Sequence, residues 1–97
     1  MDSATKTALD AAVLQRLLEH LDGRRDVQNI ELMILAGFCR NCLSKWYVEA
    51  ATQQGVDIGI EDAQQRVYGM SYSDWKEKHQ QPATPEQLER FEAARAK

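Results

Sequence analysis

Several patterns that identify common classes of protein are absent from this sequence. Cysteine occurs only twice in 97 residues, which excludes a disulfide-rich secreted domain. No apolar run reaches the roughly 20 residues of a membrane helix. Acidic residues outnumber basic ones, the net charge is −3, and the chain has no basic block of the kind that binds nucleic acid. We therefore expect neither a nucleic-acid-binding protein nor a membrane protein.

Catalytic motifs are equally scarce. The sequence contains no Ser/His/Asp set, no glycine-rich phosphate loop and no H-E-x-x-H metal motif. It therefore gives no reason to classify the protein as an enzyme. The first residues, Met1 to Lys6, are polar and lack the apolar centre of a secretory signal. We expect a cytoplasmic protein whose two cysteines are reduced.

Helical periodicity recurs along the chain, and no stretch alternates apolar and polar residues as a strand does. The pattern predicts an all-α fold of about five helices in a single domain, residues 1–97. The Thr84-Pro85 pair with Gln87 gives the clearest boundary, an N-cap, a first-turn proline and a capping box. We expect residues 1–6 to fray and residues 80–84 to link to the last helix. The expected helices cover about 7–21, 27–54, 60–68, 72–79 and 85–96.

The longest of these helices, about 27–54, is the expected centre of the fold. Asp26 is its predicted N-cap and Gly55 its predicted stop. The part from Ile30 to Cys39 carries a single charge, and a helix that is apolar all round is buried all round. Leucine, isoleucine, valine and phenylalanine supply only 20 of the 97 residues, so one chain offers a thin core. The sequence therefore predicts an intimate homodimer.

Cys39 and Cys42 form a C-x-x-C pair that allows three interpretations. They can be small buried residues beside Trp46, since free cysteine is among the most buried residue types. They can supply two of the four ligands of a zinc site, with His20 and His79 or a second subunit giving the others. They can form a thiol redox pair, but such pairs usually begin at a helix N-terminus, and the predicted helix starts well before Cys39.

Four polar residues lie on the side of the predicted helix opposite the cysteines. They are Arg40, Asn41, Ser44 and Lys45. One interpretation is a binding face for an anion or for a partner's carboxylates, or an active site that a second subunit completes. The other is a solvated helix surface, because most charged helix faces only meet water, or a face that hydrogen-bonds to the link at residues 56–59.

The segment AGFCRNCLSKWY, residues 36–47, together with Asp26–Ile30, resembles the signature of a family of short bacterial proteins classed as a domain of unknown function. The segment Tyr68–Tyr72, with Trp75 and Lys76, resembles a second block of that family. The resemblance spans about residues 26–80. It implies a small multihelical, dimeric protein of the bacterial cytosol. The family has no established activity, so the resemblance implies no catalytic residues.

Two hypotheses for function follow from the sequence. The first is a homodimeric interaction module that also binds a protein partner, and it rests on the apolar central helix and the thin core. The second is a metal- or thiol-dependent protein that uses Cys39 and Cys42. The surroundings of this cysteine pair in the folded chain distinguish between the two hypotheses.

Overall fold

The computed structural model describes residues 1–96, which form six α-helices and no β-strand. This result confirms the all-α class. No helix within these residues has both the length and the apolar character that crossing a membrane requires. The helices are α1 (Ser3–Asp22), α2 (Asn29–Ala36), α3 (Arg40–Gln53), α4 (Ile60–Tyr68), α5 (Tyr72–His79) and α6 (Pro85–Arg95).

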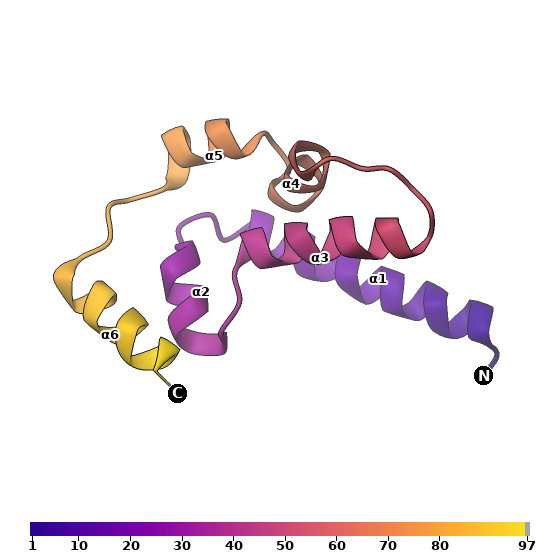
Figure 1. Ribbon diagram of the computed structural model, residues 1–97, viewed down its shortest axis with the longest axis horizontal. Coiled ribbons are helices and arrows are strands. Elements are labelled where there is room, and N and C mark those ends of the chain that lie inside the picture. Colours follow the sequence, from indigo (N-terminus) through magenta and orange to yellow (C-terminus); the bar gives the residue numbers. More distant parts are fainter. Residues whose placement is uncertain (97) are drawn as a thin grey trace.

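The helices form two groups (Figure 1). α3 packs against α4, and α4 also contacts α5 and α1. α2 packs against α6 at the other end of the molecule. We call α2 and α6 the arm, and the remaining four helices the body. The N-terminal half of α1 projects away from the body, so the molecule is elongated, with principal dimensions of 47 × 31 × 25 Å.

The prediction of one long central helix is wrong, because the chain breaks between α2 and α3. Gly37 ends α2 in the left-handed conformation, with a φ of 76° that glycine adopts without steric cost. Cys39 has an extended backbone, with φ −142° and ψ −174°, and is the N-cap of α3. The sequence hides this break because Gly37 lies in an apolar run and is not followed by a serine, threonine or aspartate N-cap.

Two predicted helix starts also need correction. Gln28, not Asp26, is the N-cap of α2, and its backbone N–H donates to Glu31 Oε1 at 2.8 Å. α1 begins at Ser3 rather than near residue 7, because the Asp2 side chain accepts from the backbone N–H of Thr5 at 2.7 Å. Residues 3–6, which were expected to fray, therefore belong to a capped helix.

The C-terminal elements agree with the sequence. α4 and α5 have the expected bounds, and residues 80–84 connect α5 to α6 without helical structure. Thr84 Oγ1 accepts from the Gln87 backbone at 3.1 Å, and Gln87 Oε1 accepts from the Thr84 backbone at 2.9 Å. These two bonds confirm the predicted capping box. The predicted domain extends to residue 97, which lies outside the described residues.

The hydrophobic core is small and lies in the body. Leu18 from α1, Val67 and Tyr68 from α4 and Trp75 from α5 form it. Trp75 is 1% exposed, whereas Trp46 is 51% exposed. The indole that anchors the body is therefore the one on α5.

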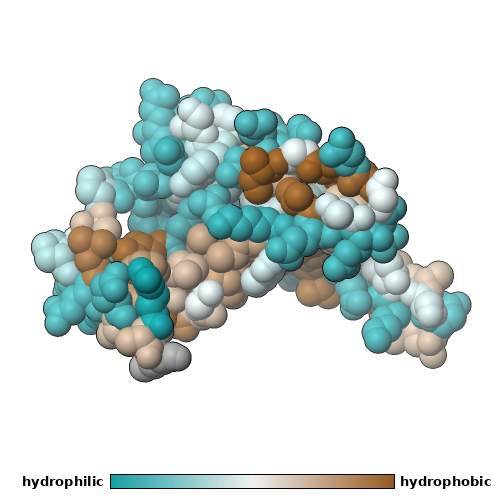
Figure 2. Space-filling view, viewed as in Figure 1, coloured by the Kyte–Doolittle hydropathy of each residue, from teal (hydrophilic) through white to brown (hydrophobic). Residues whose placement is uncertain are grey.

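The arm leaves apolar surface uncovered. α2 has the sequence NIELMILA and no buried residue, and Leu35 is 83% exposed. Figure 2 shows hydrophobic residues at the surface at the end of the molecule that the arm forms. The segment that the sequence pattern expects to be buried all round is thus only partly buried by its own chain, since Leu35 and Ala36 are exposed and most of its other apolar residues are half-buried.

Candidate functional site

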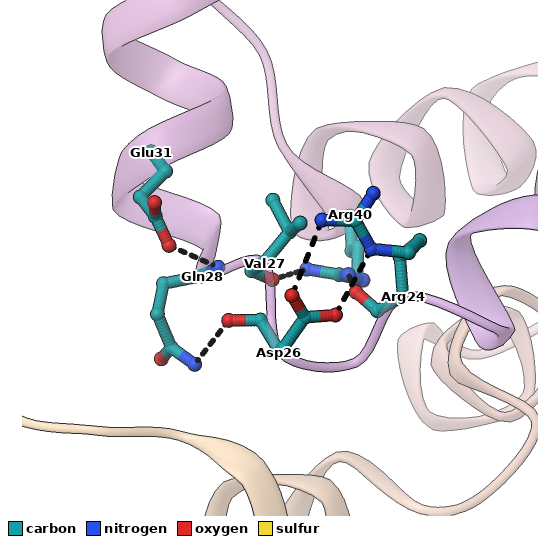
Figure 3. A network of polar contacts seen from close by, with 6 residues as sticks. All are labelled: Arg24, Asp26, Val27, Gln28, Glu31 and Arg40. Carbon is teal, nitrogen blue, oxygen red and sulfur yellow. Dashed lines mark hydrogen bonds and ion pairs between the residues drawn. The ribbon is translucent and has the colours of Figure 1, made fainter.

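The residues singled out from the sequence meet at the start of α3, where the arm joins the body. Cys39 is the N-cap of this helix, and Arg40 is its first residue. The first turn also carries Asn41 and Cys42. The loop between α1 and α2 passes beside this turn (Figure 3). Two backbone carbonyls of this loop accept hydrogen bonds from Arg40.

Arg40 is buried, 2% exposed, and binds three acceptors. Its Nη1 donates to the Val27 carbonyl at 2.8 Å and to Asn29 Oδ1 at 3.1 Å. Its Nη2 donates to the Arg24 carbonyl at 3.0 Å. The guanidinium carbon lies 4.9 Å from the centroid of the Trp75 ring. Arg40 therefore joins the α1–α2 loop, α3 and α5 in one place.

No carboxylate among the described residues forms an ion pair with Arg40. Asp26, in the same loop, is bound to Arg24 instead, with contacts of 3.1 and 3.2 Å (Figure 3). Burial lowers the pKa of Arg40, but a guanidinium stays protonated in proteins. The start of α3 therefore holds a buried positive charge that carbonyl dipoles and an aromatic face stabilise.

Gln28 fastens the arm to the segment that follows α5. It is 8% exposed, and its Oε1 accepts from the Gln81 backbone at 2.8 Å. Its Nε2 donates to the His79 carbonyl at 3.0 Å and to the Asp26 carbonyl at 3.3 Å. The Gln28 side chain thus forms hydrogen bonds with backbone groups both in the α1–α2 loop and at the end of α5, more than 50 residues later.

Tyr68 joins the same junction from α4. Its hydroxyl donates to Asn41 Oδ1 at 2.8 Å and accepts from Asn29 Nδ2 at 3.0 Å. Burial raises the pKa of Tyr68 well above its ordinary value, so the phenol stays protonated. Ser44 is fully buried, and its Oγ donates to the Arg40 carbonyl at 3.0 Å.

The four residues of the predicted binding face do not form an open surface. Arg40 and Ser44 are buried, Asn41 is half-buried, and Lys45 alone of the four is exposed. The break at Gly37 is the physical reason, because it turns the first residues of α3 toward the loop and α4. There they saturate buried carbonyl and hydroxyl groups instead of facing solvent.

For three residues that organise this junction the sequence gives no structural role, although they lie in the segments that resemble the family signature. Gln28, Tyr68 and Trp75 each bind or stack on groups far away in the chain. The Tyr68–Asn41 bond spans 27 positions and the Gln28–Gln81 bond spans 53. A single glutamine or tyrosine carries no local signal for such a role.

The two cysteines lie at a helix N-terminus, which corrects the objection raised from the sequence to a redox pair. Both are free thiols, Cys39 buried and Cys42 half-buried. Burial raises the pKa of Cys39, and the neighbouring Cys42 thiol acts in the same direction. The backbone N–H groups of Cys42 and Asn41 act against it. Trp46 is exposed and lies against Phe38, with ring centroids 5.9 Å apart.

The ligands proposed to complete a zinc site do not gather around this pair. Within residues 1–96, no group of three or more His, Cys, Asp and Glu side chains has the proximity that a metal ion needs. His20 is exposed on α1, and the His79 ring lies 6.0 Å from that of Trp75. A structural zinc site takes four ligands, so the described residues of one chain do not supply a set.

A second feature is an apolar groove of about 210 Å³ where α1, α3 and α4 meet. On α1, which also lines this groove, Leu9, Val13 and Leu17 are 51%, 69% and 38% exposed. We call these three residues the α1 stripe. The residues that line the groove are Leu14, Leu18, Leu43, Trp46, Tyr47, Ala50 and Val67.

Comparison with known proteins places the chain in a family. A search of curated proteins gives no match. A family model matches residues 27–93, a segment that contains the helices α2 to α5 and most of α6. This segment is more than half of the chain. The chain therefore belongs to the family described as "Protein of unknown function (DUF1244)".

Proposed function

We propose that the protein is a homodimeric interaction module whose two copies pair through α1. The α1 stripe is the observation that carries the proposal. Leu9, Val13 and Leu17 recur every four residues and so share one face of the helix. All three are exposed, and the buried residues of α1 are Leu18 and Leu21.

An uncovered helix of this kind needs a partner. Every residue from position 1 to position 17 is exposed, yet α1 is helical from Ser3. Isolated helices of about 12–15 residues are marginal in water, and in proteins they gain most of their stability from packing one apolar face. A covering surface would therefore stabilise the projecting half of α1.

The stripe is symmetric about its centre, which favours a second copy as that surface. Leu9 and Leu17 each lie four positions from Val13. In an antiparallel pair of α1 helices centred on Val13, Leu9 of one copy is level with Leu17 of the other. The same patch then serves both subunits, as in a closed two-fold dimer.

The groove beside the stripe supports the same arrangement. Its wall includes Trp46, which is 51% exposed, and Leu14, which is 37% exposed. Apolar side chains from the second copy would fill this space and remove both residues from water. Burial of apolar area contributes about 25 cal/mol per Å², so the small core of one chain gains support from the pairing.

The arm is the part of the proposed dimer that remains free for a protein partner. Leu35 on α2 and Leu88 on α6 are 83% and 51% exposed. They belong to the end of the molecule opposite the N-terminus of α1 (Figure 1). This separation allows dimerisation and partner binding to be altered independently.

Sedimentation velocity of the full chain over micromolar concentrations tests the dimer. We expect a species of twice the 11.1 kDa chain mass, and a Val13→Glu variant that dissociates at least tenfold more readily. Ala8→Glu places the same charge about 140° away around α1, and Leu35→Glu places it on the arm. Both controls should stay dimeric. A monomeric wild type, or a Val13→Glu protein that pairs as the wild type does, would refute the proposal.

A further inference from the structure

The start of α3 also points to an activity that dimerisation does not use. We propose that Cys39 and Cys42 are a redox-active dithiol, which a low-molecular-weight disulfide oxidises to an intramolecular disulfide. The proposal does not rest on the pairing of α1. It rests on where the chain break places the two thiols.

Cys39 and Cys42 occupy the N-cap and third positions of α3. Residues three apart in a helix are neighbours on its surface. The extended backbone of an N-cap residue turns its side chain toward the first-turn N–H groups, which is where the third residue begins. A disulfide between these positions therefore closes across a single helical turn.

Two features of the surroundings act against the burial that raises the pKa of Cys39. The pair has C-x-x-C spacing, and it lies at a helix N-terminus, where the backbone N–H groups of Cys42 and Asn41 favour the anionic form. No carboxylate of the described residues forms an ion pair with Arg40, the residue that follows Cys39. An anionic sulfur at Cys39 would meet the positive end of the helix dipole.

The exposure of the two thiols sets the order of the steps. Solvent reaches Cys42, which is half-buried, more readily than Cys39, which is 8% exposed. Cys42 is therefore the sulfur that meets the oxidant. Cys39 is the resolving sulfur, which needs access only to Cys42.

The reaction balances as two thiol–disulfide exchanges. The Cys42 thiolate attacks one sulfur of the small disulfide, forms a mixed disulfide and releases one small thiolate. The Cys39 thiolate then attacks Cys42 Sγ, forms the Cys39–Cys42 bond and releases the second small thiolate. The protein dithiol loses two electrons to the small disulfide, and the two released thiolates take up the two protons.

Equilibration of the full-length protein with defined ratios of reduced and oxidised glutathione tests the pair, with acid quenching and intact-mass analysis. We expect one dominant product, the chain with two hydrogen atoms fewer and no glutathione attached. Its formation constant should exceed that of the urea-unfolded chain at least tenfold, because the helix holds the sulfurs together. A native constant equal to or below the unfolded one, a stable glutathione adduct or a disulfide between two chains would overturn the proposal.

Two single variants test the order of steps. Cys39→Ser should retain α3, since serine is a favoured N-cap, and should accumulate one glutathione on Cys42. Cys42→Ser should react at least tenfold more slowly, because the remaining thiol is buried. Equal rates in the two variants would overturn the assigned order. If either variant fails to fold by circular dichroism, the rate at which the wild type gains its first adduct, located by peptide mapping on Cys42 or Cys39, decides the same point.

Discussion

The guanidinium of Arg40 stacks on the indole of Trp75, with 4.9 Å between the guanidinium carbon and the ring centroid. The two side chains are 2% and 1% exposed. They belong to the first turn of α3 and to α5, so their contact fixes the start of α3 against the body. The position of the cysteine pair depends on this contact, because Cys39 directly precedes Arg40.

Replacement of Arg40 is expected to destabilise the fold strongly. Arg40→Lys keeps the charge but loses the planar fork that reaches three acceptors and stacks on the ring. We expect a loss of about 3 kcal/mol in the free energy of unfolding, from buried carbonyls left without donors. Urea denaturation measures the change. Lys45→Ala, at the exposed residue five positions away, should change stability by less than about 0.5 kcal/mol.

Tyr68→Phe isolates the second polar contact of the junction. The variant keeps the ring, which lies 5.1 Å from that of Trp75, and removes the hydroxyl between Asn41 and Asn29. We expect a loss of about 2 kcal/mol, because a part-buried acceptor and donor lose their partner. A loss below about 0.5 kcal/mol in urea denaturation would show that water replaces the hydroxyl.

The same residue gives an alkaline dependence of stability. Burial raises the pKa of Tyr68 above the ordinary value of about 10, so the folded protein holds this proton more tightly than the unfolded chain. The contribution of protonated Tyr68 to the free energy of unfolding is complete below pH 10. It is lost as the pH rises above that value, where this tyrosine ionises first in the unfolded chain. Wild-type stability should therefore fall more steeply than that of Tyr68→Phe above pH 10. Parallel curves over that range would contradict the assignment.

The break that creates the cysteine site depends on one glycine. Gly37→Ala places a side chain at a φ of +76° and should cost about 1 kcal/mol, although its Cβ would meet no atom within 4 Å. Gly23 has a helical φ of −78°, and a Cβ there meets carbonyl oxygens at ordinary distances. Gly23→Ala should therefore be neutral or stabilise by about 0.5 kcal/mol. Thermal unfolding of the two variants gives the comparison.

The sequence predicts the elements of this fold better than its centre. Helices with strong local signals, such as α6 with its Thr84 and Gln87 capping box, are found where expected. The prediction of a single central helix is wrong because the break is marked in the sequence only by Gly37 and by Cys39, an unusual N-cap residue. Helical periodicity on both sides of the break hides it.

The candidate site is predictable only in part. C-x-x-C is visible in the sequence, but its position at a helix start follows from the break. From the sequence, Arg40 is expected to be a surface charge. The carbonyl groups that accept its hydrogen bonds belong to Arg24 and Val27, in a loop with no regular sequence pattern. A side chain that hydrogen-bonds to backbone groups elsewhere in the chain can be recognised only when the position of those groups is known, here that of the α1–α2 loop.

The exposure of the two tryptophans provides a spectroscopic test of the dimer. Trp75 is 1% exposed, so acrylamide quenching of the wild type reports mainly on Trp46, which lines the groove beside the α1 stripe. If the second copy covers this groove, acrylamide quenching of Trp46 should weaken as the protein concentration rises through the dissociation constant. Adding Val13→Glu should keep quenching strong at all concentrations. If quenching does not change with concentration in a protein shown to be dimeric, the interface does not include the groove.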